Sequence, residues 1–549
     1  MSFAVNNYNQ ISITDRLNHL TAREQKFLKK SWAVTFADEI FSKIDEKPFE
    51  VLFCADNGRP NTPVNINVGS LLLKELLGLT DEEMLQSLLF DTRFQYALHL
   101  TSYDEIPYSD RTPSRFRERL YNYELETGID LLKNEIERLG GEFAKLLGTN
   151  PNLQRMDSVM VSSSCKSMSR LELIFTCTAN LVKAMHALGE TMNLPANLTK
   201  YLDADTKNSV CYRMGKEEIK MSLETTIKDA MDAFLMCDET YFELKEYKVL
   251  KRMIGEQTNQ GVLKENKEIS PQSLQNPYDE DATYREKAGN KYKGYVGNFV
   301  EECGENGNVI THYDFQPNSH SDQDFCKEVI EELGKQEEKT TLIVDGAYAS
   351  EANFTAGSNN NIELVATNLS GKLPDVIVAD FLIDNEKNVV ITCPNGSEPT
   401  DCKYDEKTDA YRCHFDKQTC VDCQHKDECP VVMQKRTALV RISQKTIARA
   451  KYVKKLSTAE YVELSKKRNG VEGIPSVLRR KYGVDNIPVR GLLRSKLWFS
   501  FKIGAINVAR VIAAAKSDNN FGFLMFCKEI MVIFRMKLFL LFSFQCATK

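Results

Sequence analysis

The chain has 549 residues, which is too long for one ordinary hydrophobic core and indicates two to four structural units. A hydrophobic content of 42% and a charged content of 27% are those of a soluble globular protein. The net charge of −6 argues at first against a nucleic-acid partner. The chain starts Met1-Ser2-Phe3-Ala4, with neither a basic region nor an apolar run, so we expect no signal peptide and a cytoplasmic location.

Residues 1–150 have the pattern of a helical domain. Leucines between residues 71 and 79 form one apolar helical segment. Thr80 and Glu83 have the spacing of a capping box, which predicts the start of the next helix. Ser114, which follows Pro113, is expected to cap a further helix that carries several arginines.

A strand-like segment at residues 151–166 contains Asp157. About a hundred residues of helical pattern follow it, and we interpret residues 167–275 as a helical insertion. The polar, turn-rich segment at residues 276–281 reads as a connector.

The β pattern resumes within residues 276–350. Two strand-like runs, at 291–300 and 309–313, flank a Gly-Glu-Asn-Gly turn and predict a hairpin, and a helix is expected over 322–333. The apolar run Leu342-Ile343-Val344 then leads into Asp345 and Gly346. This pattern predicts a buried strand that delivers the Asp345 carboxylate to its C-terminal end, where it is well sited to hold a metal.

Residues 351–457 read as a second, irregular insertion that contains a cysteine cluster. Six of the fifteen cysteines fall within 37 residues: Cys393, Cys402, Cys413, Cys420, Cys423 and Cys429. The two-residue spacing between Cys420 and Cys423 lets both thiolates reach one tetrahedral Zn²⁺, with Cys429 as a third ligand. Cys393, Cys402, Cys413 or His425 could be the fourth ligand, and free thiols or a degenerate site are the alternative to structural zinc.

The C-terminal part of the chain is basic and helical. Between Lys435 and Lys516 there are 20 Lys or Arg residues and four acids, which favours contact with phosphates, whereas a solvated helical face would mix both signs. We assign residues 458–516 to this helical block. Residues 517–549 form an apolar tail whose uncharged run after Lys537 has eleven residues, short of the roughly 20 that a membrane span needs. A buried or oligomer-forming helix is the main interpretation, and a membrane-surface segment or a disrupted tail is the alternative.

Three acidic segments, taken together and in this order, resemble those of the DDE transposases of bacterial insertion sequences. They are Met156-Asp157-Ser158, Val344-Asp345-Gly346-Ala347-Tyr348, and Arg468 followed after three residues by Glu472. The resemblance extends from about residue 58 to about residue 515. It implies an α/β fold with an RNase-H-like mixed sheet, flanking helices, a helical N-terminal domain and the two insertions. The family's Tyr, three residues before the Arg, is replaced here by Ser465, and Tyr461 lies one turn earlier.

The same resemblance implies roles for individual residues. Asp157, Asp345 and Glu472 would be catalytic and would bind two Mg²⁺ or Mn²⁺ ions. Residues expected to contact DNA are Arg468, Arg479, Arg480, Lys481, Arg490 and Arg494. Residues 1–150 would bind the ends of the element, although a helical scaffold with exposed arginines is an equal alternative. The segment Cys393-Pro394-Asn395-Gly396 is similar to one in related transposases and favours Cys393 as the fourth zinc ligand.

The expected function is that of a transposase, which binds the terminal inverted repeats of a mobile element and catalyses two-metal phosphodiester hydrolysis and strand transfer. Double-stranded DNA would be its partner, the active form would be a homodimer on DNA, and the protein would associate with the bacterial nucleoid rather than a membrane. A catalytically inactive DNA-binding relative is the alternative. A third hypothesis, a zinc-stabilised interaction scaffold, predicts no DNA binding and unfolding by chelators.

Overall fold

The computed structural model describes residues 1–517, except 7–14, 56–57, 103–107, 189–193, 214, 288, 370 and 385. Residues 518–549 of the expected apolar tail therefore lie outside the described residues. The chain divides into two compact units. The first comprises Met1–Pro151, Ser158–Ser321 and Ile474–Lys549, and the second comprises Asn152–Asp157 and Asp322–Gly473.

The N-terminal part of the first unit is helical, as the sequence predicts. Its helices are α1 (Ala22–Lys29), α2 (Trp32–Glu39), α3 (Val64–Leu77), α4 (Asp81–Phe90), α5 (Thr92–Ala97), α6 (Thr112–Thr127) and α7 (Leu131–Leu147), with 3-10 turns at Arg16–His19, Phe41–Lys43 and Lys47–Leu52. The capping box at the start of α4 is confirmed, since the Glu83 amide donates to the Thr80 hydroxyl at 3.1 Å and the Thr80 amide donates to the Glu83 carboxylate at 2.8 Å. The expected cap at Ser114 is wrong. Helix α6 begins at Thr112, because Pro113 fits the first helical turn, where its missing N–H is not needed.

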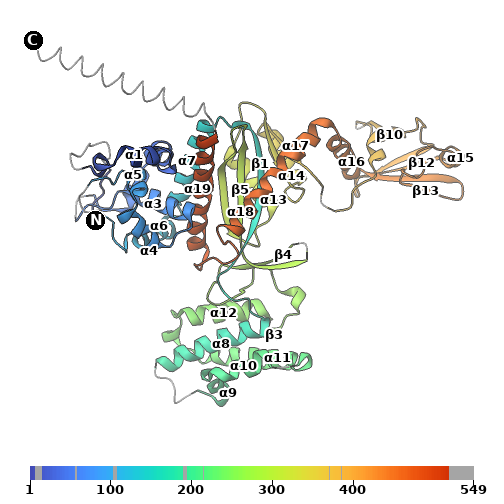
Figure 1. Cartoon of the computed structure of the whole chain (residues 1–549). Helices are drawn as coiled ribbons and strands as arrows, with labels where there is room; N and C mark the ends of the chain where they lie inside the picture. Colours follow the sequence, from blue (N-terminus) through green and yellow to red (C-terminus); the bar gives the residue numbers. More distant parts are fainter. Residues whose placement is uncertain are drawn as a thin grey trace, which may run out of the picture. The chain divides into compact units, whose positions relative to one another are not determined.

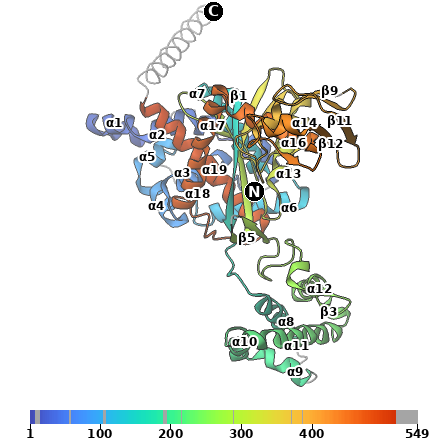
Figure 2. The same cartoon turned by 90° about the vertical axis from the view of Figure 1, so that its right-hand side faces the viewer.

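A second group of helices in the first unit follows the strand β1 (Asn150–Ser162). These are α8 (Arg170–Ala187), α9 (Ala196–Thr199), α10 (Ala204–Tyr212), α11 (Lys216–Leu235) and α12 (Lys245–Gln257), with 3-10 turns at Lys200–Leu202, Glu239–Tyr241 and Asn266–Glu268. Helix α8 contacts α10, α11 and α12, and these helices lie side by side in Figure 2. Fully buried side chains of α8, among them Ile174, Leu181 and Val182, form the core of this group. A short hairpin of β2 (Thr258–Asn259) and β3 (Val262–Leu263) follows α12.

A six-stranded mixed sheet has the order β4-β5-β1-β7-β8, with β6 paired to β5 (Figure 1). Its strands are β1 (Asn150–Ser162), β4 (Thr283–Lys287), β5 (Asn290–Cys303), β6 (Val309–Pro317), β7 (Thr340–Val344) and β8 (Ile362–Ala366). Strand β5 runs antiparallel to β4 and β6, which confirms the expected hairpin, whereas β7 runs parallel to β1 and β8. Strand β1 contributes residues to both units.

Helix α19 (Leu492–Ser517) forms part of the core of the first unit. It contacts α3, α7 and β6, and it lies between the N-terminal helices and the strands in Figure 1. Gly297 in β5 makes room for it, because a Cβ atom there would lie 2.4 Å from Cζ of Phe499. By length and composition α19 could cross a membrane, but 78% of its most apolar window is buried inside the protein, as in the core helix of a globular unit.

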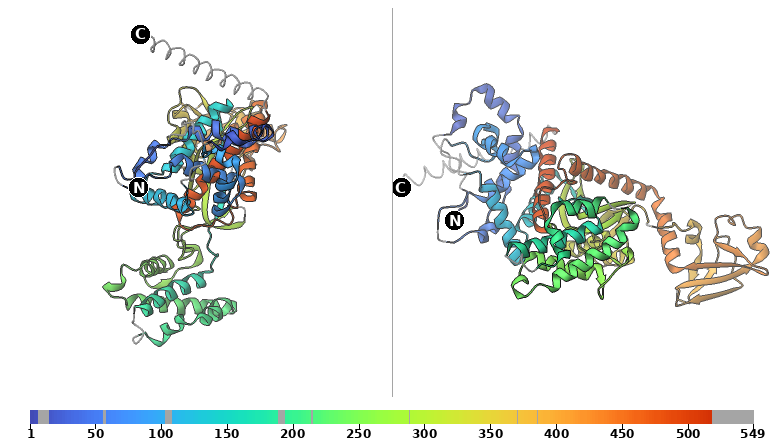
Figure 3. Two further views of the ribbon diagram at one scale, coloured as in Figure 1. Left: turned by 60° about the vertical axis from the view of Figure 1, so that its left-hand side comes forward. Right: turned by 90° about the horizontal axis from the view of Figure 1, so that it is seen from below.

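The second unit contains α13 (Asp322–Leu333), in agreement with the predicted helix, followed by β7, α14 (Glu351–Asn359) and β8. The irregular structure expected for residues 351–457 is not what the structure shows. Strand β8 extends the main sheet, and two smaller sheets follow it, with orders β10-β9 and β11-β12-β14-β13 (Figure 3, orange). Their elements are a 3-10 turn at Val376–Asp380, β9 (Leu382–Asp384), β10 (Val389–Thr392), β11 (Asp401–Asp405), β12 (Ala410–Asp416), α15 (Lys417–Val421), β13 (Val431–Met433) and β14 (Thr437–Ser443).

The basic C-terminal block begins in the second unit. It forms α16 (Gln444–Leu456), α17 (Ala459–Asn469) and the 3-10 turn η9 (Gly470–Glu472), after which α18 (Gly473–Arg480) continues into the first unit. The 3-10 turn η9 thus interrupts the α-helical path directly at Glu472, before Gly473 and Pro475 begin α18.

Candidate active site

Asp345 follows directly after β7 in the second unit. Leu342, Ile343 and Val344 are fully buried, and the side chain of Asp345 is 31% exposed. The amide of Gly346 donates to the Asp345 carboxylate and to the side-chain oxygen of Asn368, both at 2.6 Å. A Cβ atom on Gly346 would lie 2.6 Å from the Asn368 carbonyl, so this close turn needs glycine. The carboxylate is therefore held in a fixed place at the end of a buried strand.

Asp157 lies in β1, next to β7. The parallel register pairs Gln154 with Leu342 and Arg155 with Ile343. Continued for two residues, this register sets Asp157 level with Asp345. Because side chains on a strand alternate between its faces, the two carboxylates share one face of the sheet. The side chain of Asp157 is 14% exposed.

Glu472 ends the 3-10 turn η9, which directly follows helix α17. Hydrogen bonds near both ends of α17 fix this helix to the sheet and so position Glu472 near the two aspartates. At the first end, the hydroxyl of Tyr461 donates to the carboxylate of Glu363 in β8 at 2.6 Å. At the second end, the guanidinium of Arg155 in β1 donates to the carbonyl of Lys467. Glu363, Arg155 and Asn368 thus position the site, although no local sequence pattern identified them.

The guanidinium of Arg468 lies among the three predicted carboxylates. Its Nη1 is 2.9 Å from Oε1 of Glu472, and its Nη2 is 3.7 Å from Oδ1 of Asp157 and 4.0 Å from Oδ2 of Asp345. Its side chain is only 12% exposed, and its Nε is buried with no hydrogen-bond partner among the described residues. The structure thus brings Asp157, Asp345 and Glu472 around one positive group. Nowhere in the described ranges do three or more His, Cys, Asp or Glu side chains stand as a group that could hold a metal ion.

The carboxylate of Glu363 stabilises the second unit in a way that depends on pH. Burial raises the pKa of its carboxyl group, but hydrogen bonds from Lys339, Tyr461 and Lys455 outweigh this effect and lower the pKa from 4.5 to about 2. Lys339 lies 2.7 Å and Lys455 3.0 Å from this carboxylate. A lowered pKa means that the ionised group stabilises the fold fully above pH 4.5 and loses this contribution as the pH falls toward 2.

We therefore expect Glu363→Gln to lower the free energy of unfolding by about 1 to 2 kcal/mol at neutral pH, since it weakens hydrogen bonds to a charged group. The deficit should shrink as the pH is lowered from 4.5 toward 2. Urea unfolding at pH 7 and pH 3 measures both quantities. Glu331→Gln is a matched control, because Glu331 is 62% exposed and has only a 3.7 Å pair with Lys327 on its own helix. An equal deficit for Glu363→Gln at both pH values would show that the carboxylate charge is not the stabilising feature.

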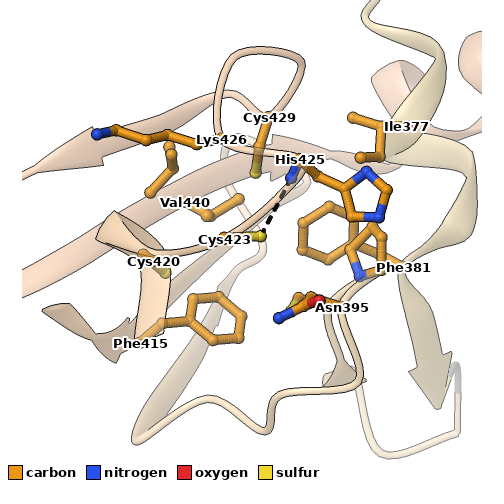
Figure 4. Close-up of a pocket in the computed structure, with 13 residues that line it drawn as sticks. Ile377, Phe381, Asn395, Phe415, Cys420, Cys423, His425, Lys426, Cys429 and Val440 are labelled. Carbon is orange, nitrogen blue, oxygen red and sulfur yellow. Dashed lines mark hydrogen bonds between the residues drawn. The ribbon is translucent and has the colours of Figure 1, made fainter. Parts of the chain in front are cut away.

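The predicted cysteine cluster lines one small cavity in the second unit. Cys420, Cys423, His425 and Cys429 contribute to its wall (Figure 4). Cys393 also lines the cavity, whose volume is about 30 Å³. The backbone amide of His425 donates to Sγ of Cys423 at 3.4 Å. Burial raises the pKa of Cys429 to about 11, and the nearby thiols of Cys420, Cys393 and Cys423 also raise it.

The other two cysteines considered as ligands face each other instead. The Sγ atoms of Cys402 and Cys413 lie 2.8 Å apart across β11 and β12, and neither residue lines the cavity. Of the four alternatives for a fourth ligand, Cys393 and His425 are therefore the two that lie at the cavity with Cys420, Cys423 and Cys429.

The remaining residues expected to contact DNA belong to the first unit and are exposed. These are Arg479, Arg480, Lys481, Arg490 and Arg494. Nε of Arg479 lies 3.5 Å from Asp485, while Arg490 and Arg494 lie over the rings of Tyr278 and Tyr121 at 5.9 Å and 4.6 Å. Tyr461 is only 3% exposed and is bound to Glu363, so it supports α17 and is not placed to take over the DNA contact of the family's Tyr.

Two family models match the chain. One is described as a transposase DDE domain and matches residues 392–512, which include the cavity cysteines, Arg468 and Glu472. The other is described as a transposase domain (DUF772) and matches residues 23–119. Both matches confirm the resemblance to the DDE transposases of insertion sequences. No curated protein and no solved structure matches the chain.

Proposed function

We propose, from the premise that this chain is a DDE transposase, that it binds the terminal inverted repeats of a mobile DNA element and cuts a phosphodiester bond at each end. The observation that carries the proposal is the convergence of Asp157, Asp345 and Glu472 on one guanidinium group. Asp157 lies in β1, Asp345 directly follows the neighbouring strand β7, and Glu472 ends the 3-10 turn η9, so the three acids come from distant parts of the chain.

Asp157, Asp345 and Glu472 would hold two Mg²⁺ or Mn²⁺ ions. Their carboxylate oxygens are the ligands that these cations prefer, and their arrangement around a positive group supports the view that they are placed for a cation. Such ions supply stabilisation of negative charge on the attacking and leaving oxygens. The turn at Gly346 and the hydrogen bonds at the two ends of α17 would then hold the three carboxylates in position beside the scissile phosphate.

The reaction proceeds in two balanced steps. Water attacks the phosphorus and the P–O3′ bond breaks, which leaves a 3′-hydroxyl on the element and a 5′-phosphate on the flanking DNA. The freed 3′-hydroxyl then attacks a phosphorus of the target DNA, and the displaced 3′-oxygen of the target takes up a proton. One P–O bond is made for each that breaks, so the reaction needs neither a nucleoside triphosphate nor a covalent enzyme intermediate.

An RNase-H-like core is part of this proposal. The order of β1, the β5–β6 hairpin, α13 and β7 supports it, because such a fold needs a strand, a hairpin, a helix and a strand before its second carboxylate. The exposed basic residues Arg479, Arg480, Lys481, Arg490 and Arg494 would contact DNA phosphates. Because two DNA ends must be brought together, we also propose a homodimer as the active form.

We further propose a structural zinc ion at Cys393, Cys420, Cys423 and Cys429. Four thiols around one small cavity are a donor set that Zn²⁺ prefers in structural sites. The rest of the wall combines apolar side chains such as Phe381 and Phe415 with Asn395, His425 and Lys426, and a volume of about 30 Å³ leaves no place for a substrate. The ion would therefore stabilise the four-stranded sheet and would take no part in catalysis.

Cleavage of a labelled duplex that carries the end of the element tests the proposal. We expect the chain to bind this duplex without added divalent ions and to nick it only after Mg²⁺ or Mn²⁺ is added. Binding without nicking under any divalent ion would favour the inactive DNA-binding relative. A chain that binds no DNA and unfolds in chelator would favour the zinc-stabilised scaffold.

A further inference from the structure

We infer that Arg468 is the resident cation of the carboxylate site: its guanidinium holds Asp157, Asp345 and Glu472 together before divalent ions enter, and it leaves as they bind. The inference rests on the proposed function, because it takes these three acids as the metal ligands. It assigns to Arg468 an exchange with metal, in addition to the DNA contact that the family resemblance implies.

The geometry shows one charge shared among three partners. Arg468 pairs with each carboxylate, but only the 2.9 Å contact with Glu472 lies within hydrogen-bond range. The contacts with Asp157 and Asp345, at 3.7 Å and 4.0 Å, are electrostatic. An arginine placed to make a permanent structural bridge would more often donate two parallel hydrogen bonds to one carboxylate.

Electrostatics explains why a cation is needed at this place. Three carboxylates brought together without a positive group repel one another, which opposes the packing of α17 against β1 and β7. Arg468 lies in α17, four residues before Glu472 in η9, and its positive charge offsets this repulsion. The metal-free protein can thereby keep its ligands close to their working positions.

The same contacts also allow a divalent ion to displace the guanidinium group of Arg468. Its Nε is a buried donor without a hydrogen-bond partner in the described part of the chain, and such a group lowers the stability of the arrangement that contains it. Its strongest partner, Glu472, is 61% exposed, so the pair borders on solvent. A divalent ion, with twice the charge and no unsatisfied donor, can displace the guanidinium, which then becomes available to a DNA phosphate beside the site.

Titration of the DNA-free, full-length chain with Mn²⁺ tests the exchange. In Arg468→Gln the ion no longer competes with a guanidinium, so we expect its Kd, measured by calorimetry, to fall about 10-fold. Without added divalent ions, the melting temperature of this variant should fall below that of the wild type, and it should recover in saturating Mn²⁺. Lys466→Gln is the matched control, because it removes the same charge from the same helix at a residue that is 66% exposed and paired with Glu463; neither quantity should change.

The outcomes separate this inference from the proposed function. If the wild type binds Mn²⁺ and Asp345→Asn does not, but Arg468→Gln binds no more tightly than the wild type, the exchange is refuted and the metal site stands. If no form of the chain binds Mn²⁺, the metal site of the proposed function fails, and the exchange fails with it.

A measurement on the wild type covers the case in which Arg468→Gln does not fold. Phenylglyoxal modifies accessible guanidinium groups, and mass spectrometry locates the modified residues. Arg468, at 12% exposure, should react slowly without added divalent ions and several times faster in saturating Mn²⁺, whereas Arg479, at 40% exposure, should react at a similar rate in both conditions. Equal or slower modification of Arg468 in Mn²⁺ would overturn the inference.

Discussion

Replacing Asp345 by Asn should reduce the divalent-ion-dependent cleavage of an end-bearing duplex at least about 10³-fold, while binding of the duplex is retained. Asn has almost the same shape, so the turn at Gly346 can form, but it lacks the charge that a hard cation requires. Loss of metal-derived stabilisation worth several kcal/mol corresponds to a rate effect of this size. Single-turnover cleavage in Mg²⁺ or Mn²⁺, together with a gel-shift measurement without added divalent ions, gives both quantities.

Asp375→Asn is the appropriate control. It removes one carboxylate charge from an exposed residue of the same unit, which precedes a 3-10 turn and takes no part in the ion pairs of Arg468. Its cleavage rate should match that of the wild type. Cleavage by Asp345→Asn at the rate of Asp375→Asn would remove Asp345 from the site and refute the three-acid assignment. Glu472→Gln tests the third carboxylate in the same way. This variant too should lose cleavage of the duplex and retain binding to it.

Replacing Cys423 by Ser should abolish the binding of one zinc ion per chain and unfold the four-stranded sheet around the cavity. The loss is large because the binding free energy of a structural zinc ion contributes directly to folding. Elemental analysis of the purified chain gives the zinc content, and limited proteolysis reports unfolding as new cleavage between about residues 390 and 440. Addition of a strong chelator to the wild type should produce the same proteolytic pattern.

Single serine variants also identify the fourth ligand. Cys393→Ser should lose the ion, whereas Cys402→Ser should keep it, because Cys402 faces Cys413 and does not line the cavity. Retention of zinc by Cys393→Ser together with its loss in His425→Ala would move the fourth position to the histidine. A wild-type chain without zinc, and resistant to chelator, would refute the site.

Structural features that depend on a short stretch of the chain could be predicted from the amino-acid sequence. The apolar run before Asp345, the helix at 322–333 and the hairpin of β5 and β6 each follow from local pattern and turn chemistry. The pairing of Arg468 with Glu472 also follows from their spacing on a helix.

Contacts that depend on tertiary packing could not be predicted. No local rule places Arg468 beside Asp157 and Asp345, because that contact requires β1, β7 and α17 to come together from distant parts of the chain. Glu363 belongs to a strand of only five residues in a segment with few regular features, and its role depends on partners in three other places. The short strands from β9 to β14 were missed for the same reason, since a strand of three to seven residues becomes stable only when its neighbours pair with it.

Helix α19 has a consequence for how a newly made chain matures. Its buried face, which includes Phe499, Phe501 and Ile503, completes the packing of α3, α7 and β6, all of which leave the ribosome long before it does. Until α19 arrives, these earlier elements expose apolar surface that has no covering partner, which is the condition under which chains are captured by chaperones or degraded. Synthesis that stops before Leu492 therefore yields chains that the cell can clear. A fragment that ends there lacks the helix that completes the core of the first unit.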